Sequence, residues 1–336
     1  MKRQLLPLSE QVIVITGASS GIGLVTAKRA AHRGARVVLA ARNENDLRAA
    51  CEGIRREGGR AICVVADVAN PDDVKKIGDT AVAEFGRIDT WVNNAAVSMY
   101  GKTFEIPIED MRRQMDVNFW GHVYGSREAV RHLREHGGAL VNVASGLADR
   151  AIPLQGVYCA AKHAIKAFTD SLRMELEKDG IPISVSLVKP ASIDTPFFEK
   201  SKTYIGVEPQ PIPPVYAPEI AAGVILRCAE QPTREVFAGG AAELITLARL
   251  LPRAADWYME KMLFRQQRTS EPASPDRPAN LYAPVAHDGG ERSHTWKGRT
   301  RETSAMTWAE MRPLAALALA AVTFLGLATL RGYARS

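Results

Sequence analysis

A tyrosine and a lysine stand four residues apart in the segment Tyr158-Cys-Ala-Ala-Lys162. Residues at this spacing lie on one face of a helix, so the lysine would hold an ammonium group beside the phenol. A nearby positive charge favours the phenolate and lowers its pKa from about 10 toward neutrality. A phenol tuned in this way can exchange a proton with an alcohol or a carbonyl oxygen. The spacing alone is common by chance and is also typical of a surface helix pair, so the interpretation depends on further residues.

A glycine-rich segment near the start of the chain, T-G-A-S-S-G-I-G at residues 16–23, supplies a second set of chemistry-bearing positions. It follows an apolar run at 12–16 and opens a helical pattern. Gly17 would permit a tight turn, Gly21 a close approach of the backbone to a diphosphate, and Gly23 close packing of helix on strand. The start of that helix offers free N–H groups and a partial positive charge to phosphates. The segment therefore predicts a dinucleotide site, with a glycine-rich turn that binds no ligand as the alternative.

The residue that follows the second apolar run indicates which dinucleotide is bound. Sites for NAD usually place Asp or Glu there, against the ribose 2′-hydroxyl. This chain has Ala41 followed by Arg42. A guanidinium can hold a 2′-phosphate and stack on adenine. We therefore expect NADP(H) in preference to NAD(H), and a solvated surface arginine is the alternative.

Apolar runs alternate with helical patterns through the first 240 residues or so. Strands are expected at 12–16, 35–40, 61–65, 90–93, 139–143, 183–187 and 235–237, and helices at 21–33, 43–57, 71–85, 108–133, 158–178 and 218–230. Strict alternation with short connections predicts an α/β fold with a doubly wound parallel sheet (a Rossmann fold) in three layers, α/β/α. Ligands would then bind at the carboxyl ends of the strands.

Six separated motifs, in this order, resemble those of the short-chain dehydrogenase/reductase family over roughly residues 10–240. The motifs are the glycine-rich segment, Asp67-Val68, Asn93-Asn94-Ala95-Ala96, Asn118, the set Ser145, Tyr158 and Lys162, and K-P-A-S-I-D-T at 189–195. Two positions depart from the family pattern, because Ala96 and Ala191 stand where it has glycine. Since glycine alone freely adopts positive φ, these departures bear on the local backbone angles.

The resemblance implies a catalytic tetrad of Asn118, Ser145, Tyr158 and Lys162. Tyr158 would be the acid in reduction and the base in oxidation, and Lys162 would lower its pKa and bind the nicotinamide ribose. Ser145 would donate to the substrate oxygen, and Asn118 would stand at a helix kink that holds a water. The implied cofactor-binding residues are Gly17, Ser19, Ser20, Gly21, Ile22, Gly23, Arg42, Asp67, Val68, Asn94, Ala95, Tyr158, Lys162, Pro190, Ile193 and Thr195. The resemblance also implies a homodimer or homotetramer formed through the helices at 108–133 and 158–178.

Apolar side chains that follow the catalytic motifs are candidates for substrate recognition. A flap is expected from Phe197, Phe198, Tyr204 and 209–214, and an opposite wall from Met99, Tyr100, Leu147, Ile152 and Leu154. No arginine constellation that would bind a carboxylate is evident. We therefore expect an apolar ketone, aldehyde or secondary alcohol, lipid-like, steroid-like or acyl-derived, and ordinary loop packing is the alternative.

Composition argues against other classes of site. The 336 residues carry a net charge of +6 without a clustered basic face, which disfavours nucleic-acid binding. The four cysteines form no C-x-x-C pair and the seven histidines show no ligand spacing, so we expect no metal and a reducing compartment. No apolar region follows Lys2 and Arg3, so a secretory signal is not expected.

Three parts are expected along the chain. Residues 8–264 form the NADP-binding oxidoreductase domain, and 265–313, rich in Pro, Ser, Arg and Gly, form an extended tail with an apolar island at 280–282. Residues 314–330 contain no charge and reach the lower limit of about 17 residues for a membrane-anchor helix. An amphipathic or core helix is the alternative there. With an inserted anchor, the catalytic domain would remain cytoplasmic.

The sequence thus predicts an NADP(H)-dependent oxidoreductase that interconverts a hydroxyl and a carbonyl on a small apolar substrate. A non-catalytic nucleotide-binding regulator, or a membrane-tethered scaffold on the same fold, is the alternative. An enzyme should keep activity on a soluble substrate after deletion of 265–336, whereas a scaffold should lose its role.

Overall fold

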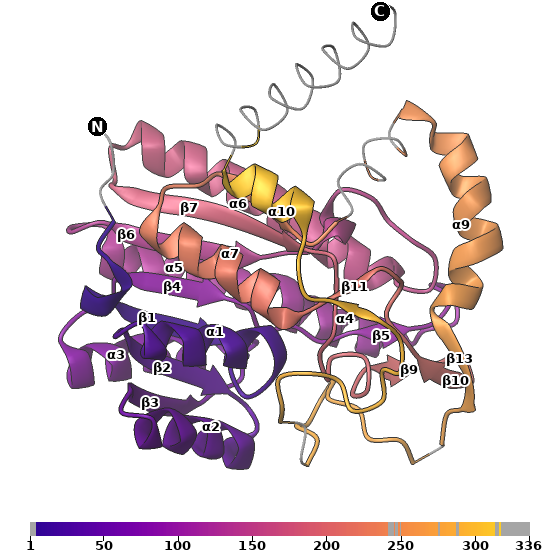
Figure 1. The fold of residues 1–336 in the computed structure, drawn as a ribbon, viewed down its shortest axis with the longest axis horizontal. Coiled ribbons are helices and arrows are strands. Elements are labelled where there is room, and N and C mark those ends of the chain that lie inside the picture. Colours follow the sequence, from indigo (N-terminus) through magenta and orange to yellow (C-terminus); the bar gives the residue numbers. More distant parts are fainter. Residues whose placement is uncertain are drawn as a thin grey trace, which may run out of the picture.

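A seven-stranded parallel sheet forms the centre of the computed structural model, which describes residues 5–240, 245, 248, 250–274, 276–286, 289–312 and 316 (Figure 1). The strand order is β12-β7-β6-β4-β1-β2-β3, and each neighbouring pair is parallel. The strands are β1 (Val12–Thr16), β2 (Arg36–Ala41), β3 (Arg60–Val65), β4 (Thr90–Asn93), β6 (Gly138–Val143), β7 (Ile183–Pro190) and β12 (Glu235–Ala238). This topology confirms the predicted doubly wound α/β fold.

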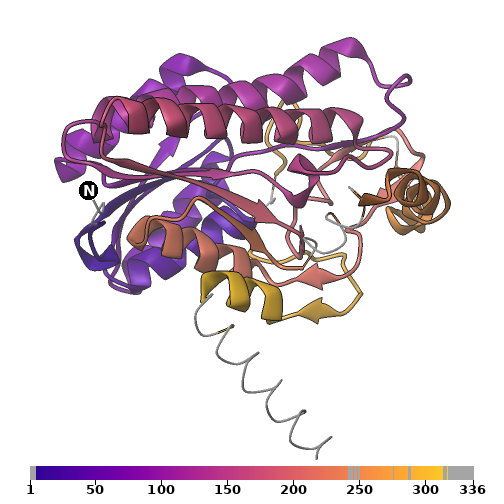
Figure 2. The same cartoon turned by 90° about the horizontal axis from the view of Figure 1, so that it is seen from above.

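Helices cover both faces of the sheet, which explains the continuous apolar strands (Figure 2). Every residue of β1, β4 and β7 is buried. One hydrophobic cluster packs α1 (Gly21–His32), α2 (Glu44–Arg56) and α7 (Pro218–Glu230) on the sheet. The second cluster packs α3 (Pro71–Phe85), α5 (Gly121–Leu133) and α6 (Gly156–Lys178) on the other face. The expected three layers are therefore present.

Local signals account for where the helices begin and end. The Asn70 side chain accepts a hydrogen bond from the Asp72 amide, and Pro71 occupies the first turn of α3. Gly86 ends that helix with a φ of 79°. These residues are the start and stop signals that the sequence displays.

The expected long helix at 108–133 contains a π-helical segment. It consists of α4 (Ile108–Met115), the π segment η2 (Asp116–Trp120) and α5 in direct succession. The π segment includes Asn118, so the expected irregularity lies at the expected residue. Such segments are frequent at functional sites.

The residues after the sheet lie against the domain. We use "the tail" for residues 268–274, 276–286 and 289–301. Short strands tie it to earlier loops: β13 (Arg268–Pro272) pairs with β10 (Val207–Pro209), and β14 (Thr300–Arg301) pairs with β11 (Val215–Tyr216). Leu281 of the apolar island is buried. The remaining elements are η1 (Leu8–Glu10), β5 (Met99–Tyr100), η3 (Gly146–Ala148), β8 (Ser192–Ile193), β9 (Lys202–Thr203), α9 (Pro252–Gln266) and α10 (Ala305–Met311).

The predicted membrane anchor at 314–330 lies outside the described residues, Ala316 excepted. Among the helices that the structure describes, none has the length and apolar character needed to span a bilayer.

Candidate active site

A cavity of about 660 Å³ lies at the carboxyl ends of the sheet strands. This is where a doubly wound sheet places its ligands. Its walls bring together residues that are distant in sequence. Sixteen predicted site residues line it, namely Gly17, Ser19, Ser20, Gly21, Ile22, Arg42, Asp67, Val68, Asn94, Ala95, Ser145, Tyr158, Lys162, Pro190, Ile193 and Thr195.

The loop between β1 and α1 requires its glycines. Gly17 and Gly21 have φ values of 66° and 55°, where other residues are strained. A Cβ on Gly17 would lie 2.7 Å from the Ala95 Cα, and one on Gly23 would lie 2.2 Å from the Gly17 oxygen. Gly23 therefore lies behind the loop and permits its path. The start of α1 lines the cavity, at the place where a helix N-terminus would meet a dinucleotide phosphate.

Thr16 and Asn94 hold this loop against the end of β4. The Thr16 hydroxyl accepts hydrogen bonds from the amides of Asn94 and Ala95, at 3.0 and 3.1 Å. The Asn94 side chain donates to the carbonyls of Thr16 and Gly17, at 2.9 and 3.2 Å. The paired asparagine motif thus shapes the phosphate loop through the backbone.

The two positions where alanine replaces the family's glycine are unstrained. Leu154, with a φ of 67°, is the one non-glycine residue of positive φ in the described chain. Ala96 and Ala191 therefore adopt backbone angles that any residue tolerates. The departures do not distort the loops that carry them.

Arg42 is held by the tail. Its guanidinium donates to the carbonyls of Asn280, Leu281 and Tyr282, the last two at 3.4 and 3.1 Å. One of its nitrogens lies 3.9 Å from the Asp67 carboxylate. Arg42 is therefore not a solvated surface arginine but connects the wall of the cavity to the tail.

Tyr158 lies in the first turn of α6 and lines the cavity. Its ring meets that of Phe197 edge to face, with 6.0 Å between centroids. Burial raises the pKa of the phenol well above its usual value, while a hydrogen bond with Ser145 acts in the opposite direction. The expected lowering of this pKa by Lys162 is wrong for this structure, because the desolvation of a fully buried phenol dominates.

Lys162 is buried on the same helix, with its Nζ 5.5 Å from the centre of the Tyr158 ring. The ammonium donates to the Val143 carbonyl at 3.0 Å. Burial lowers the pKa of Lys162 to about 7. His122 lies 3.3 Å from the same carbonyl, and burial, followed by the charge on Lys162, lowers its pKa to about 3. His122 is thus neutral beside a lysine that changes charge near pH 7.

Asn118, the fourth tetrad residue, lies behind the cavity wall. Its amide nitrogen donates to the Val97 carbonyl at 2.9 Å, and its oxygen accepts from the Val97 amide at 2.8 Å. Val97 itself lines the cavity. The Asn118 side chain therefore positions the segment after β4.

The predicted substrate residues divide into two groups. Those that line the cavity are Leu147, Ile152, Phe197, Phe198 and 212–214. Met99, Tyr100 and Leu154 are buried behind the wall, and the Tyr204 hydroxyl bonds Asp110. These four belong to the packing of the domain.

Sequence reasoning missed α9 as a wall of the cavity. One face of this helix contributes Ala255, Met259 and Leu263 to the lining, and Leu251, which immediately precedes the helix, continues this row. Their spacing of four residues is a helical signal that could have been found. In Figure 1 the helix stands at the right edge of the molecule.

Polar groups interrupt the apolar wall. Arg150 lines the cavity and pairs with Asp256 of α9. Gln155 also lines it, and its amide donates to the Gln267 oxygen at 2.7 Å. The expected apolar wall therefore also contains two polar side chains, Arg150 and Gln155.

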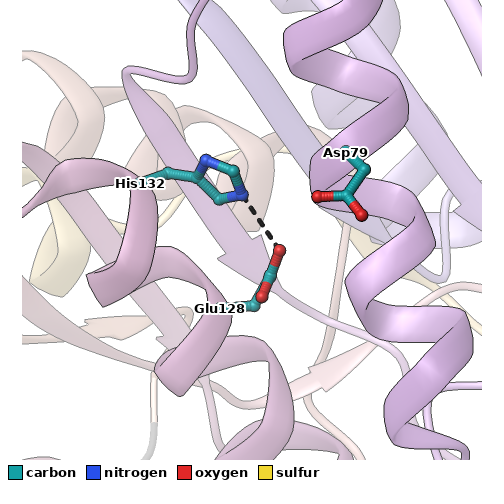
Figure 3. Close-up of side chains that lie close together, drawn as sticks. All are labelled: Asp79, Glu128 and His132. Atoms are coloured by element: carbon teal, nitrogen blue, oxygen red, sulfur yellow. Dashed lines mark hydrogen bonds and ion pairs between the residues drawn. The ribbon is translucent and has the colours of Figure 1, made fainter.

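A separate cluster of Asp79, Glu128 and His132 lies between α3 and α5 (Figure 3). The His132 Nε2 lies 2.9 Å from Glu128. Arg131 donates to both carboxylates, with 2.6 Å to Asp79. Because a guanidinium already occupies the place of a cation, this cluster is an ion-pair network.

Comparison with known proteins relates this geometry to a known family. A profile of the short chain dehydrogenases matches residues 11–205. The chain is 45% identical to an uncharacterized oxidoreductase (YxnA) of Bacillus subtilis strain 168, over 95% of this chain and 90% of the relative. It is 34% identical to 11-beta-hydroxysteroid dehydrogenase A of Sesamum indicum, over 80% of this chain and 78% of the relative.

A solved structure shares the fold. The alcohol dehydrogenase of the archaeon Thermococcus sibiricus, complexed with 5-hydroxy-NADP, aligns with a TM-score of 0.60 and 23% identity. The alignment covers 68% of this chain and 95% of that one.

Proposed function

This chain belongs to the short-chain dehydrogenase family and is an oxidoreductase, and we propose that it interconverts a hydroxyl and a carbonyl group with NADP(H). The observation that carries the proposal is the convergence of Ser145, Tyr158 and Lys162 on one cavity with the glycine-rich loop. A bound nicotinamide would supply or accept the hydride at the substrate carbon.

The protein's own part in reduction is to deliver a proton to the substrate oxygen. The raised pKa keeps the Tyr158 phenol protonated at neutral pH, so it is ready to act as the acid. Ser145 donates to the same oxygen, where negative charge develops as the carbonyl is reduced. In oxidation the roles reverse, and the phenolate form of Tyr158 accepts the proton of the alcohol.

Lys162 stabilises the phenolate that remains after proton donation. Its side chain is buried and bonds the Val143 carbonyl. Because the surroundings have a low dielectric constant, its charge interacts strongly with the phenolate. With a pKa of about 7, it can take up and release a proton at physiological pH. We therefore assign two roles to Lys162: its charge stabilises the Tyr158 phenolate, and it helps to return a proton to Tyr158.

NADP(H) preference rests on Arg42. Its guanidinium lines the cavity at the end of β2, where it can pair with a 2′-phosphate in bidentate geometry. No acidic residue follows β2 at the two positions after Ala41, which are Arg42 and Asn43. The tail carbonyls that Arg42 holds would then share it with the phosphate or give way to it.

The substrate proposed is an apolar hydroxyl or ketone compound of sterol-like size. Phe197, Phe198, Ile212 and the inner face of α9 provide apolar walls near Tyr158. Arg150 and Gln155 offer polar contacts to a second oxygen of the substrate. The name of the Sesamum indicum relative, a hydroxysteroid dehydrogenase, agrees with this class.

The test measures turnover by the full-length protein on a panel of apolar ketones and sterols. The absorbance of NADPH monitors the reaction, and NADH is tested in parallel. We expect consumption of NADPH and a kcat/KM ratio for NADPH over NADH well above one. A ratio near or below one would overturn the cofactor preference. Binding of NADPH with no turnover on any carbonyl or alcohol would overturn the proposed reaction.

A further inference from the structure

Lys200 is a buried cation directed at the phosphate loop, and no motif of the family assigns it a role. The residue is 9% exposed and lines the active-site cavity. Its Nζ donates to the Ser20 hydroxyl at 2.7 Å. Ser20 immediately precedes α1, so the Lys200 ammonium lies at the N-terminal end of this helix. This is the end that would face the cofactor phosphates.

We propose that Lys200, which lies between Phe198 and Tyr204, is a phosphate ligand of the bound dinucleotide and is positioned by the tail. The proposal rests on the nicotinamide dinucleotide of the proposed function. A lysine ammonium beside the start of a helix adds a full charge to the helix's partial one, and both attract phosphate.

At the start of α1, the Ser20 side chain does not cap the helix and instead bonds another side chain. Serine before a helix usually caps it by accepting from the next amides, but Ser20 makes no such bond within the described part of the chain. Its hydroxyl instead bonds Lys200. The Gly21 amide donates to the Gly290 carbonyl of the tail at 2.8 Å. The tail thus uses one amide of the loop, and Lys200 adds a donor of full charge beside it.

The tail also fixes the backbone that carries Lys200. The Asn280 amide donates to the Lys200 carbonyl at 2.9 Å. Arg277, whose side chain is 8% exposed, donates to the carbonyls of Phe198, Glu199 and Ser201. Since these carbonyls flank Lys200, its side chain is held toward the loop by neighbours on both sides.

The same stretch of tail joins the two ends of the nucleotide site. Asn280 bonds Lys200 through its amide and Arg42 through its carbonyl. Arg42 is the proposed ligand of the 2′-phosphate, whereas Lys200 lies at the glycine-rich loop. The backbone of one residue, Asn280, therefore links two cationic residues that would contact different phosphates.

The experiment measures the dissociation constants of NADP⁺, NAD⁺ and adenosine 2′-monophosphate by calorimetry, using full-length wild type and Lys200→Met. We expect NADP⁺ to bind about tenfold to a hundredfold more weakly to the variant. An equal loss for NAD⁺, with adenosine 2′-monophosphate unchanged, places the contact on the diphosphate. A loss confined to NADP⁺ and adenosine 2′-monophosphate places it on the 2′-phosphate.

Two further variants keep the test decisive. Lys200→Arg should retain most of the affinity, because it keeps a charged donor at the site. Lys178→Met removes a charge from the exposed end of α6 and should change each constant less than twofold. Dissociation constants for NADP⁺ and NAD⁺ within twofold of wild type in Lys200→Met would overturn the inference. Wild type that binds neither dinucleotide would instead refute the proposed function.

Discussion

The catalytic end and the nucleotide end of the cavity are built in different ways. Ser145, Tyr158 and Lys162 come from a strand end and one helix of the buried core. Arg42 and Lys200, at the nucleotide end, depend on backbone carbonyls and amides of the tail. The first arrangement is fixed by local spacing, and the second by contacts between residues about 80 to 240 positions apart. We therefore expect substitutions at the catalytic end to change the rate of reaction, and substitutions at the nucleotide end to change the affinity for the dinucleotide.

The largest effect is expected from Tyr158→Phe, which tests the catalytic end alone. Loss of the proton donor should lower kcat about a thousandfold while the dissociation constant of NADP⁺ changes less than threefold. The measurement is steady-state NADPH consumption together with calorimetry. Tyr258→Phe, which removes a hydroxyl from another tyrosine of the cavity wall, serves as the control and should keep kcat within threefold. Substantial turnover by Tyr158→Phe would contradict the assignment of Tyr158 as the proton donor.

Arg42→Leu tests the nucleotide end at the 2′-phosphate. The dissociation constant of NADP⁺ should rise about tenfold to a hundredfold, and that of NAD⁺ should change less than threefold. Arg48→Leu, on the exposed side of α2, gives the same change of charge and should leave both constants unaltered. Equal weakening of both dinucleotides would show that Arg42 acts through the tail and not on the phosphate.

Arg277→Leu tests whether the tail holds the backbone of residues 198–201 in place. The change leaves the carbonyls of 198, 199 and 201 without their donor, so we expect KM for substrate to rise about threefold to tenfold with little change in kcat. The melting temperature should fall by about 2–6 °C. Arg277→Lys should rescue this variant only in part, because an ammonium lacks the planar fork of a guanidinium. Arg299→Leu, exposed on the same tail, is the control, and an equal rise in KM there would contradict a specific role.

Lys162→Met tests the electrostatic cost of the catalytic end. Below pH 7 the lysine is charged in both folded and unfolded protein, and its burial fully opposes folding. Between pH 7 and its unfolded pKa of about 10.4, the folded state has released a proton that the unfolded state keeps, so wild type gains stability relative to the variant. The variant should therefore melt on the order of 5 °C higher than wild type at pH 6, with the gap narrowing toward pH 10.

Thermal melts across that range check this prediction, with Lys178→Met at the exposed end of α6 as the control. A gap that is independent of pH would show that the pKa of Lys162 is not depressed in the folded protein.

The sequence predicted those parts of the molecule that depend on spacing. Gly17 and Gly21 take the positive φ that the glycine pattern required, and Tyr158 and Lys162 share one helical face. These two features follow from neighbours within a few residues, which a sequence displays directly. The π segment lies at Asn118, where the family resemblance implied a kink.

Other parts had no local signal. The carbonyls that hold Arg42 are backbone atoms of 280–282, and any residue type could provide them. The raised pKa of Tyr158 depends on burial of the phenol in the assembled cavity, whereas helix spacing shows only the nearby lysine. Deletion of 265–336 was expected to spare activity. The contacts of Arg277 and Asn280 now predict that such a deletion weakens the nucleotide end.

The contact between Lys28 and Glu291 joins residues 263 positions apart. Contacts of such separation form late in folding, because a long loop must close before they can form. During synthesis the catalytic residues would emerge and pack long before the tail leaves the ribosome. A nascent chain would thus hold a finished set of reacting groups beside an open nucleotide site. Synthesis and packing of the tail would be the step that makes it competent to retain its cofactor.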